Sequence, residues 1–451
     1  MSAVVVARST LVIGGGYAGI AAAVELSGRG EHVTLLEARR HWGGRATSWP
    51  DPRMGDEVDN GQHVWLGCYD ATLQLLERLG TRELVAFAPG LDLAYREPGG
   101  RTHRLRAHPS LGKPGLALAL MTYRAMPAGD RLALGRALAQ APPPRADDTA
   151  SAWLDGLGQS AQARRAFWSP LCEAAVNLPL ELASAALLHA VVVRAFRGAP
   201  GAAAVGVPRA GLAALVAPVA DVLAARGGMA RLGATVRALA PGPQGFRAIL
   251  EGGEEVHAAS VVLALPAEAA RGLLGALPVA ASRLEATVAV PASPIVTATL
   301  WFDPALDLPK LTGLLGPEAE GFHWVFDRGA FVAPKTAARP VVLVASAARE
   351  LAALPTAEIV ARARLALERY GFTRAEPVAV RVVKEPHATP AFTPGAAQAR
   401  PGTDSGVPGL AFAGDWTATG LPATIEGAVQ SGLAAARNVI LRHPTATEAP
   451  A

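Results

Sequence analysis

The first fifty residues alternate short apolar runs with glycine-rich and charged breaks. Two apolar runs, Val4–Val6 and Leu11–Ile13, lead into the glycine-rich turn Gly14–Gly19. An alanine-rich stretch follows, and a further apolar run, Val33–Leu36, ends on Glu37. Short apolar runs bounded by glycine favour buried strands, and the alanine-rich stretch favours a helix. The pattern therefore predicts a strand, a turn, a helix and a second strand, followed by an acidic residue.

Each residue type in this unit has a distinct role in binding a dinucleotide. Gly14 permits the tight turn, Gly16 lets the backbone approach a pyrophosphate, and Gly19 lets helix and strand pack closely. The start of the helix presents free N–H groups and a partial positive charge to phosphates. Glu37, eighteen residues after Gly19, can accept hydrogen bonds from a ribose diol. The alternative is an ordinary glycine-rich turn with Glu37 as a surface carboxylate.

The segment after the acid indicates which dinucleotide is bound. Gly43 and Gly44 let the chain pass close to a cofactor, and Arg45 can neutralise a pyrophosphate. Arg39 either faces the same phosphates or is a solvated surface arginine. A Gly-Gly-Arg sequence directly after the ribose-binding acid resembles the FAD-binding amine oxidase and carotenoid desaturase superfamily.

A second cofactor motif lies near the C-terminus. Leu410–Asp415 has the pattern of a last strand, and a helix is expected to begin near Thr424. Asp415 can hold the ribityl or pyrophosphate part of a flavin. The N-terminus of the helix can direct its dipole at the N1–C2=O edge of the isoalloxazine, which becomes negative on reduction. A capped helix packed on the sheet is the alternative, but the two motifs together favour FAD over NAD.

The whole pattern predicts an α/β fold, with a Rossmann-like FAD-binding domain and an inserted α+β substrate domain. The predicted elements are helices over Tyr69–Leu79, from Val207 to about Arg226, and over Thr356–Tyr370, with strands over Ala234–Leu239, Ser260–Pro266, Val296–Phe302 and Val341–Ser346. The predicted division assigns 1–85, 205–274 and 401–442 to the FAD-binding domain, 86–204 to a mainly helical insert, 275–400 to a mixed-sheet part and 443–451 to a disordered tail.

Composition narrows the class of protein. The chain of 451 residues is 51% hydrophobic and 18% charged, with a net charge of +4. Because no basic run with interleaved aromatic residues is present, nucleic acid is not expected as a partner. Cys68 and Cys172 supply neither a disulfide framework nor a metal-ligand spacing, so no metal is predicted. We see no signal peptide and no apolar stretch of spanning length, which favours a cytoplasmic location.

One segment bears on membrane contact. Residues 111–138 combine the apolar run Leu116–Met121 with Lys113, Arg124 and two further arginines. One interpretation is a basic amphipathic segment in peripheral contact with the inner face of a membrane. The other, which we favour from the sequence, is a buried helix with exposed arginines.

Longer motifs make the resemblance specific. The motifs similar to the squalene-associated FAD-dependent desaturase family are Asp59–His63 with Gly67–Tyr69, Gly414–Thr417 running into Pro422–Ala428, and Val383–Pro390 followed by Arg400–Gly402. The similarity spans nearly the whole chain, although other members often carry Ala and Trp at Gly15 and Tyr17. The resemblance implies a hydroxysqualene dehydroxylase of hopanoid biosynthesis.

What the resemblance implies is a reductive step on an apolar C30 isoprenoid alcohol, with FAD as cofactor and an external electron donor. An acid near the hydroxyl must weaken the carbon–oxygen bond, and an apolar tunnel must hold the isoprenoid. His63 is the candidate acid, with Gln62 and Asp59 as candidate orienting residues.

The remaining candidates line the cofactor or the pocket. Trp65, Tyr69 and Trp416 are candidate pocket aromatics, which could stabilise an allylic cation. The residues predicted to bind FAD are Gly14, Gly16, Tyr17, Ala18, Gly19, Glu37, Ala38, Arg39, Gly43, Gly44, Arg45, Gly61, Gln62, His63, Val236, Gly414, Asp415, Thr424, Ile425 and Ala428.

Three other functions are compatible with these motifs. A carotenoid desaturase would share the fold and reverse the direction of hydride flow. An amine oxidase commonly uses a lysine near flavin N5, and of the four lysines only Lys310 or Lys335 looks suitably placed. A non-catalytic partner of a membrane-associated prenyl-transfer complex would bind FAD without turning over any isoprenoid.

Overall fold

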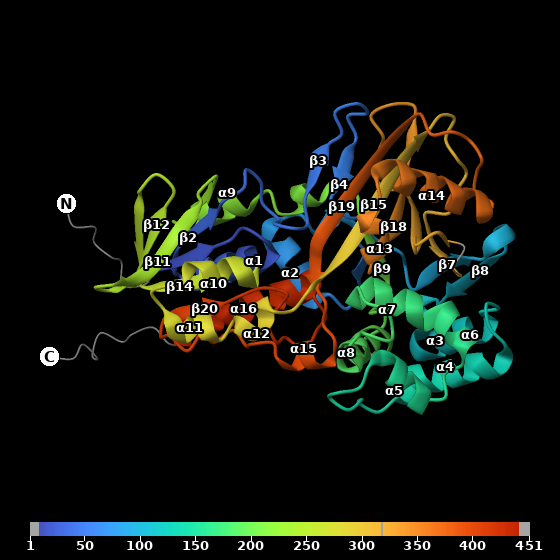
Figure 1. Ribbon diagram of the computed structural model, residues 1–451, viewed down its shortest axis with the longest axis horizontal. Helices are drawn as coiled ribbons and strands as arrows, with labels where there is room; N and C mark the ends of the chain where they lie inside the picture. The colour runs from blue at the N-terminus through green and yellow to red at the C-terminus, as the bar shows by residue number, and fades with distance from the viewer. Residues whose placement is uncertain (1–8, 317–318, 442–451) are drawn as a thin grey trace.

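The computed structural model describes residues 9–316 and 319–441, and it contains two units that lie side by side (Figure 1). The first is built on a five-stranded sheet and the second on a seven-stranded sheet. The tail predicted over 443–451 lies outside the described residues. Within the described residues, no helix combines the length and the apolar composition needed to cross a membrane.

The first sheet is parallel throughout. Its strands, in spatial order, are β10 (Met229–Leu232), β2 (His32–Glu37), β1 (Ser9–Ile13), β14 (Ser260–Leu263) and β20 (Leu410–Phe412). Val12 in the central strand pairs with Leu35 on one side and with Val262 on the other. Both faces of β1, β14 and β20 are covered, which is why their sequences are mainly apolar, whereas the edge strand β10 is partly exposed.

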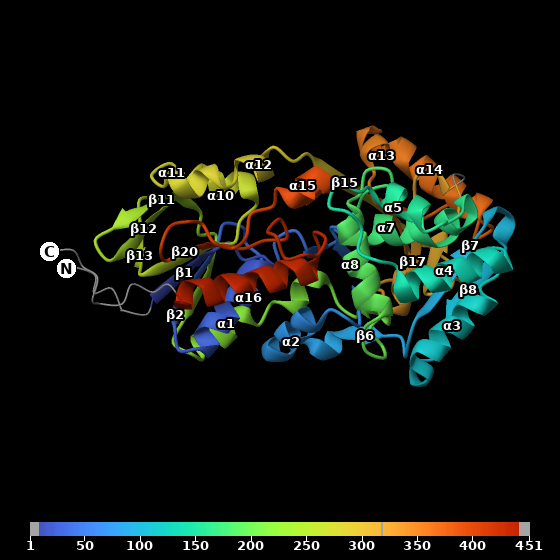
Figure 2. The same cartoon turned by 90° about the horizontal axis from the view of Figure 1, so that it is seen from below.

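Helices from distant parts of the chain cover one face of this sheet. They are α1 (Tyr17–Gly28), α9 (Val219–Ala224) and α16 (Ile425–Leu441), with α2 (Asp70–Leu79) beside them (Figure 2). The other face carries α10 (Ala267–Leu273), α11 (Pro278–Ser282), α12 (Glu285–Val288) and a three-stranded antiparallel sheet of β11 (Val236–Gly242), β12 (Gly245–Leu250) and β13 (Glu255–Ala258).

The second unit contains the larger, mixed sheet. Its strands, in spatial order, are β19 (Ala379–Pro390), β15 (Ala292–Phe302), β18 (Arg339–Ala345), β17 (Trp324–Asp327), β16 (Leu311–Leu314), β7 (Asp92–Arg96) and β8 (Thr102–Arg106). Helices α13 (Arg349–Ala353) and α14 (Thr356–Arg369) pack on one face through alternate residues such as Val296 and Leu343. Alternate residues point to opposite faces of a strand, so Val342 and Val344 face the other way, where Val64 meets them.

A helical layer completes the second unit. It consists of α3 (Gly112–Thr122), α4 (Ala128–Gln140), α5 (Ala150–Gly156), α6 (Ala161–Ala163), α7 (Ser169–Val176) and α8 (Ala185–Phe196), while α15 (Pro394–Gln398) lies against α8. These helices share a core with Tyr95 and Leu105 of the sheet. The short strands β3 (Ser48–Pro50), β4 (Glu57–Asp59), β5 (Trp65–Leu66), β6 (Val85–Phe87) and β9 (Val205–Pro208) form two small sheets outside both main sheets.

The structure corrects one predicted element. The helix expected to begin at Val207 is wrong at its start, because Val205–Pro208 forms β9 between β5 and β6. Prolines at 208 and 218 break the rest into a short 3-10 turn, Leu212–Leu215, and α9. The strand expected over Ala234–Leu239 is present as β11, and it belongs to the small antiparallel sheet.

A close approach of backbone segments shapes the first turn. Gly14 has φ +111° and donates its N–H to the Leu36 carbonyl at 2.8 Å. A Cβ atom at Gly19 would overlap the carbonyl oxygen of Gly14, so the start of α1 can only lie this close to β1 with glycine at that position.

Gly19→Ala should therefore lower the free energy of unfolding by about 3 kcal/mol, because the added methyl group would overlap backbone atoms that cannot move aside. Chemical denaturation monitored by circular dichroism measures this value. Gly28→Ala is the matched control in the same helix, since its Cβ would meet only Arg226 Nη1 at 3.5 Å. The control should change the value by no more than about 1 kcal/mol; equal losses would contradict the close-packing argument.

Candidate active site

The glycine turn leaves an open space at the start of α1. Gly16 stands at the N-cap of α1, and a Cβ there would meet only Gly44 Cα, at 3.9 Å. Gly43 donates its N–H to the Gly15 carbonyl at 2.9 Å, which holds the second glycine pair against the first. Tyr17 and Ala18 form the buried first turn of the helix. The helix N-terminus thus faces a space bordered by backbone, suited to a phosphate group.

Glu37 is held in place by backbone donors. Its Oε2 accepts a hydrogen bond from Gly15 N–H at 2.6 Å, and its Oε1 accepts one from Arg39 N–H at 2.8 Å. The Ala234 N–H donates to the Glu37 carbonyl at 2.9 Å, so the chain leading to Val236 lies beside the end of β2. This places Glu37 and Val236 together at the carboxyl edge of the parallel sheet, where ligands bind in such folds.

Arg39 and Ala38 lie further out. Both side chains are exposed, and Arg39 Nη1 donates to the Gly44 carbonyl at 3.2 Å. Of the two sequence interpretations, the surface position describes Arg39, although its guanidinium reaches the Gly43–Gly44 turn.

Arg45 and Asp415 join the two cofactor motifs directly. Arg45 Nη2 lies 2.5 Å from Asp415 Oδ1, and Arg45 Nη1 donates to the Ala388 carbonyl at 2.8 Å. The neighbouring Asp415 carboxylate raises the pKa of Arg45, so the guanidinium stays charged. The pair brings a cation and an anion from opposite ends of the chain to one place beside the glycine turn.

The turn after Asp415 is clamped by Arg400, which sequence reasoning did not single out as a site residue. This buried side chain donates to the carbonyls of Asp415, Trp416, Thr417 and Leu421. Its guanidinium also lies over the Phe392 ring, 4.4 Å from the centroid, and burial lowers its pKa to about 10. Arg400 acts as a positioning residue for the segment that leads into α16.

The N-terminus of α16 is fixed from two sides. Thr424 Oγ1 accepts the Gly427 N–H at 3.1 Å and caps the helix, while Gly414 donates its N–H to Ser431 Oγ at 2.9 Å. Glu426 accepts from Thr72 N–H at 2.9 Å, which docks α2 onto the first turn. Ile425 and Ala428 lie partly buried in the same turn. The positive end of the helix dipole therefore has a fixed direction next to Asp415.

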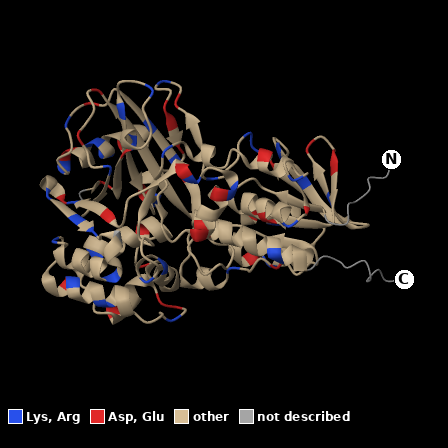
Figure 3. Cartoon of the chain, turned by 180° about the vertical axis from the view of Figure 1, so that it is seen from behind, with Lys and Arg blue, Asp and Glu red and all other residues tan. Residues whose placement is uncertain are grey.

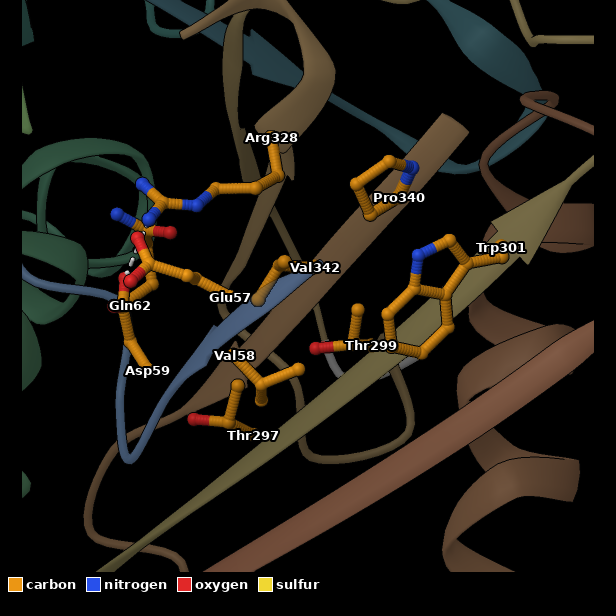
Figure 4. A pocket seen from close by; sticks show the side chains of 10 residues that line it. All are labelled: Glu57, Val58, Asp59, Gln62, Thr297, Thr299, Trp301, Arg328, Pro340 and Val342. Atoms are coloured by element: carbon orange, nitrogen blue, oxygen red, sulfur yellow. Dashed lines mark ion pairs between the residues drawn. The ribbon is translucent and has the colours of Figure 1, made fainter. Parts of the chain in front are cut away.

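A buried ion pair lies at the end of β4, where the polar loop begins. Asp59 Oδ2 lies 3.1 Å from Arg328 Nη2, and Asp59 Oδ1 accepts from Leu212 N–H at 3.3 Å. Burial raises the pKa of Asp59, and the charge of Arg328 opposes that shift. Figure 4 shows Arg328 reaching towards Asp59 above the β15 residues Thr297 and Thr299. The cavity between them has a volume of about 10 Å³, room for one water molecule and no more.

His63 follows Gly61 and Gln62 in this loop. Its Nδ1 lies 2.6 Å from the Gly61 carbonyl, which only accepts, so Nδ1 carries the proton and Nε2 the lone pair. Burial lowers the pKa of His63, so the ring is neutral at neutral pH. Gln62 donates to the His63 backbone carbonyl at 3.3 Å and Asp59 binds Arg328, so the ring is oriented by Gly61 rather than by the two expected residues.

The three candidate aromatics separate into two groups. Trp65 and Trp416 are fully buried in the cores of the first unit, and Trp416 Nε1 donates to the Leu265 carbonyl at 2.9 Å. The expectation that these two line a pocket stays a prediction; the Trp65 Nε1 is buried without a hydrogen-bond partner in the part of the chain that the structure describes. Tyr69 differs, since its side chain is only partly buried and lies near Thr424 at the start of α16.

The chain offers a further feature that fits a bound flavin nucleotide. The Tyr17 hydroxyl is buried and has no hydrogen-bond partner within residues 9–316 and 319–441, and burial raises its pKa. A buried donor without a protein partner, on the residue that follows Gly16 and near enough to Asp59 for that charge to raise its pKa, fits a site that a polar ligand completes. Lys310 and Lys335, the lysines considered for an amine oxidase, are both exposed.

Comparison with known proteins agrees with this geometry. The model of a family described as flavin containing amine oxidoreductase matches residues 17–440. The chain belongs to this family. It is an FAD-dependent oxidoreductase, and the residues around the glycine turn, Glu37, the Arg45–Asp415 pair and the start of α16 are those suited to hold FAD.

Individual relatives of this flavin oxidoreductase differ in how much of the chain they match. A hydroxysqualene dehydroxylase from Rhodopseudomonas palustris is 32% identical over 96% of this chain and 98% of its own length. A zeta-carotene desaturase from Synechocystis is 34% identical over 29% of this chain and 27% of its own length. A solved structure of a putative protoporphyrinogen oxidase from Exiguobacterium shares the fold, with a TM-score of 0.70 and 17% identity over 97% of this chain and 99% of that one.

Glu37→Gln should weaken FAD binding about 10- to 100-fold. In glutamine an NH2 group replaces one of the two carboxylate oxygens, so a donor would face a backbone N–H donor and the negative charge would be lost. Titration of the apoprotein with FAD, followed by flavin fluorescence, measures the dissociation constant. Glu25→Gln is the control, since Glu25 pairs with Arg29 and Arg78 on the outer side of α1. An unchanged constant in Glu37→Gln would rule out Glu37 as a cofactor ligand.

Proposed function

We propose that this flavin oxidoreductase removes the hydroxyl group of hydroxysqualene to give squalene. The observation that carries the proposal is the extent of the match to the dehydroxylase from R. palustris, which covers 96% of this chain. The desaturase match covers only 29% of this chain, so more than two thirds of the chain lie outside it. In a family with a shared cofactor fold, similarity across the substrate-binding part is the stronger guide to the reaction.

The reaction balances as a reductive substitution at an allylic carbon. The carbon–oxygen bond breaks, the hydroxyl group takes up a proton and leaves as water, and a carbon–hydrogen bond forms in its place. Reduced FAD, when bound, supplies the hydride. An external electron donor must then provide two electrons and a proton for the next turnover.

The residues of the chain have distinct tasks in this scheme. Gly16, Glu37 and the Arg45–Asp415 pair hold the nucleotide and diphosphate. The fixed N-terminus of α16 stabilises negative charge on the reduced ring system. On the face of the large sheet opposite α13 and α14, Phe326, Val342 and Val344 are apolar side chains next to Val64, which favours an isoprenoid and disfavours water.

His63 is our candidate for proton delivery, and it can deliver a proton only when its ring is protonated. With Nδ1 bonded to the Gly61 carbonyl, only Nε2 can carry the proton to be delivered. Since burial lowers the pKa of His63, the protonated ring is the minor form at neutral pH. Asp59 lies close enough for its charge to raise the pKa of His63, and it thereby favours the protonated form.

The reaction itself is tested with purified holoenzyme whose flavin has been reduced under anaerobic conditions. Added hydroxysqualene should yield squalene, detected by mass spectrometry, with stoichiometric reoxidation of the flavin. Oxidised holoenzyme is the control and should give none. Intact alcohol with the flavin still reduced would reject the dehydroxylase, and the oxidised enzyme would then be assayed with polyene precursors for desaturation.

The role of His63 is tested by its pH profile. The wild-type kcat should fall about tenfold per pH unit above the lowered pKa, because only the protonated ring can donate. His63→Gln should lose this slope and about a hundredfold or more in kcat while retaining bound FAD. His257→Gln, on the surface of β13, is the matched control. Full turnover with an unchanged profile in His63→Gln would remove His63 from the mechanism.

A further inference from the structure

Helix α3 presents an apolar stripe to solvent. Leu111, just before the helix, is 48% exposed, and Leu118 and Met121 are 58% and 51% exposed. Pro114 is exposed between them. The spacings of three, four and three residues place all four side chains on one face of a helix. The sequence alternative of a buried helix with exposed basic residues describes α3 only in part, because its exposed side also carries these apolar side chains.

The opposite face of α3 is anchored in the core. Ala119 and Leu120 are buried, and the following Tyr123 donates its hydroxyl to the Ala166 carbonyl at 2.8 Å. The helix is thus apolar on both faces. A helix of this kind is normally covered on all sides, by protein or by lipid.

The charge of the surrounding segment indicates that lipid covers the apolar stripe of α3. Residues 98–129 contain five Lys or Arg residues and no Asp or Glu. Two of the five, in β8, pair with Asp92 of β7, and the other three include the two that flank α3. Elsewhere Lys and Arg alternate with Asp and Glu over the face shown in Figure 3. Lys113 and Arg124 are exposed at the two ends of α3, so that basic side chains flank the apolar stripe. Apolar side chains flanked by basic ones match the acyl chains and headgroups of an anionic leaflet.

A cavity opens at the base of the same helix. Its volume is about 170 Å³, and its lining includes Lys113 and Leu116 of α3, Leu91 before β7 and Phe196 at the end of α8. Phe196 and Tyr69 both pack against the buried cluster of Cys68, Ala195 and Ala202. Because Ala195 and Ala202 also line the cavity, this apolar cluster extends from the foot of α3 to Tyr69.

We propose that α3 is the membrane-contact element of this enzyme. Leu111, Leu118 and Met121 insert among the acyl chains of an anionic leaflet, and Lys113 and Arg124 lie at the headgroups. In this orientation the cavity opens towards lipid, so an apolar ligand can enter without crossing water. Figure 2 shows α3 projecting at one edge of the second unit, where a flat surface can reach it. The proposal goes beyond the dehydroxylation reaction and does not depend on it.

The test uses the FAD-loaded full chain and flotation with vesicles of phosphatidylglycerol and phosphatidylcholine. The wild type should bind these vesicles, bind pure phosphatidylcholine less, and release with rising salt. Leu118→Asp combined with Met121→Asp should lower the partition coefficient about tenfold or more, since two inserted side chains are lost. Val279→Asp is the control, because Val279 is 56% exposed on α11 in the other unit.

A second variant keeps the proposal testable if the first double variant does not fold. Lys113→Glu with Arg124→Glu changes only exposed groups, and it should abolish the preference for anionic vesicles while leaving bound FAD and the melting temperature unchanged. The proposal is overturned if the wild type binds neither vesicle, if both double variants bind as the wild type does, or if Val279→Asp weakens binding equally. None of these readouts requires turnover.

Discussion

Helix α16 can lie directly on α1 because residue 432 has no side chain. A Cβ atom at Gly432 would overlap the carbonyl oxygen of Ala18, so the two helices touch backbone to backbone. This contact brings the C-terminal cofactor motif to the glycine turn at the start of the chain. Bonds on either side, from Gly414 to Ser431 and from Thr72 to Glu426, hold α16 at that depth. The orientation of its N-terminus follows from the contact.

The elements that could be predicted are those with a strong local pattern. Strands β1, β2 and β14 are continuous apolar runs, and α2 ends where Gly80 adopts a left-handed conformation. The helical prediction for 86–204 included no strand, yet β7 and β8 lie there. Each is only five residues long, and only β8 alternates exposed and buried positions. Strand β7 joins β8 to the rest of the sheet by pairing with β16, some two hundred residues away. Pairing between distant short segments leaves little trace in a local pattern.

The candidate site residues divide in the same way, into those with a local sequence signal and those without one. Gly14, Gly16, Gly19 and Glu37 could be chosen from spacing alone, since each role depends on near neighbours in sequence. The partners of Arg45 and Asp59 could not. Arg45 was assigned to the pyrophosphate and Asp59 to His63, whereas the structure pairs them with Asp415 and Arg328. Likewise, nothing near Arg400 in sequence indicates that its side chain donates hydrogen bonds to four carbonyls of a later turn.

The Gly432–Ala18 contact also dictates an order of events during synthesis. A chain emerging from the ribosome can complete the large sheet once β19 is made, but its first sheet must wait for β20 and α16. Until then the alanine-rich outer surface of α1 stays uncovered, in the state in which nascent domains depend most on chaperones. The part of the FAD site that α16 forms is therefore completed after the large sheet, and a nascent chain that lacks α16 also lacks that part of the site.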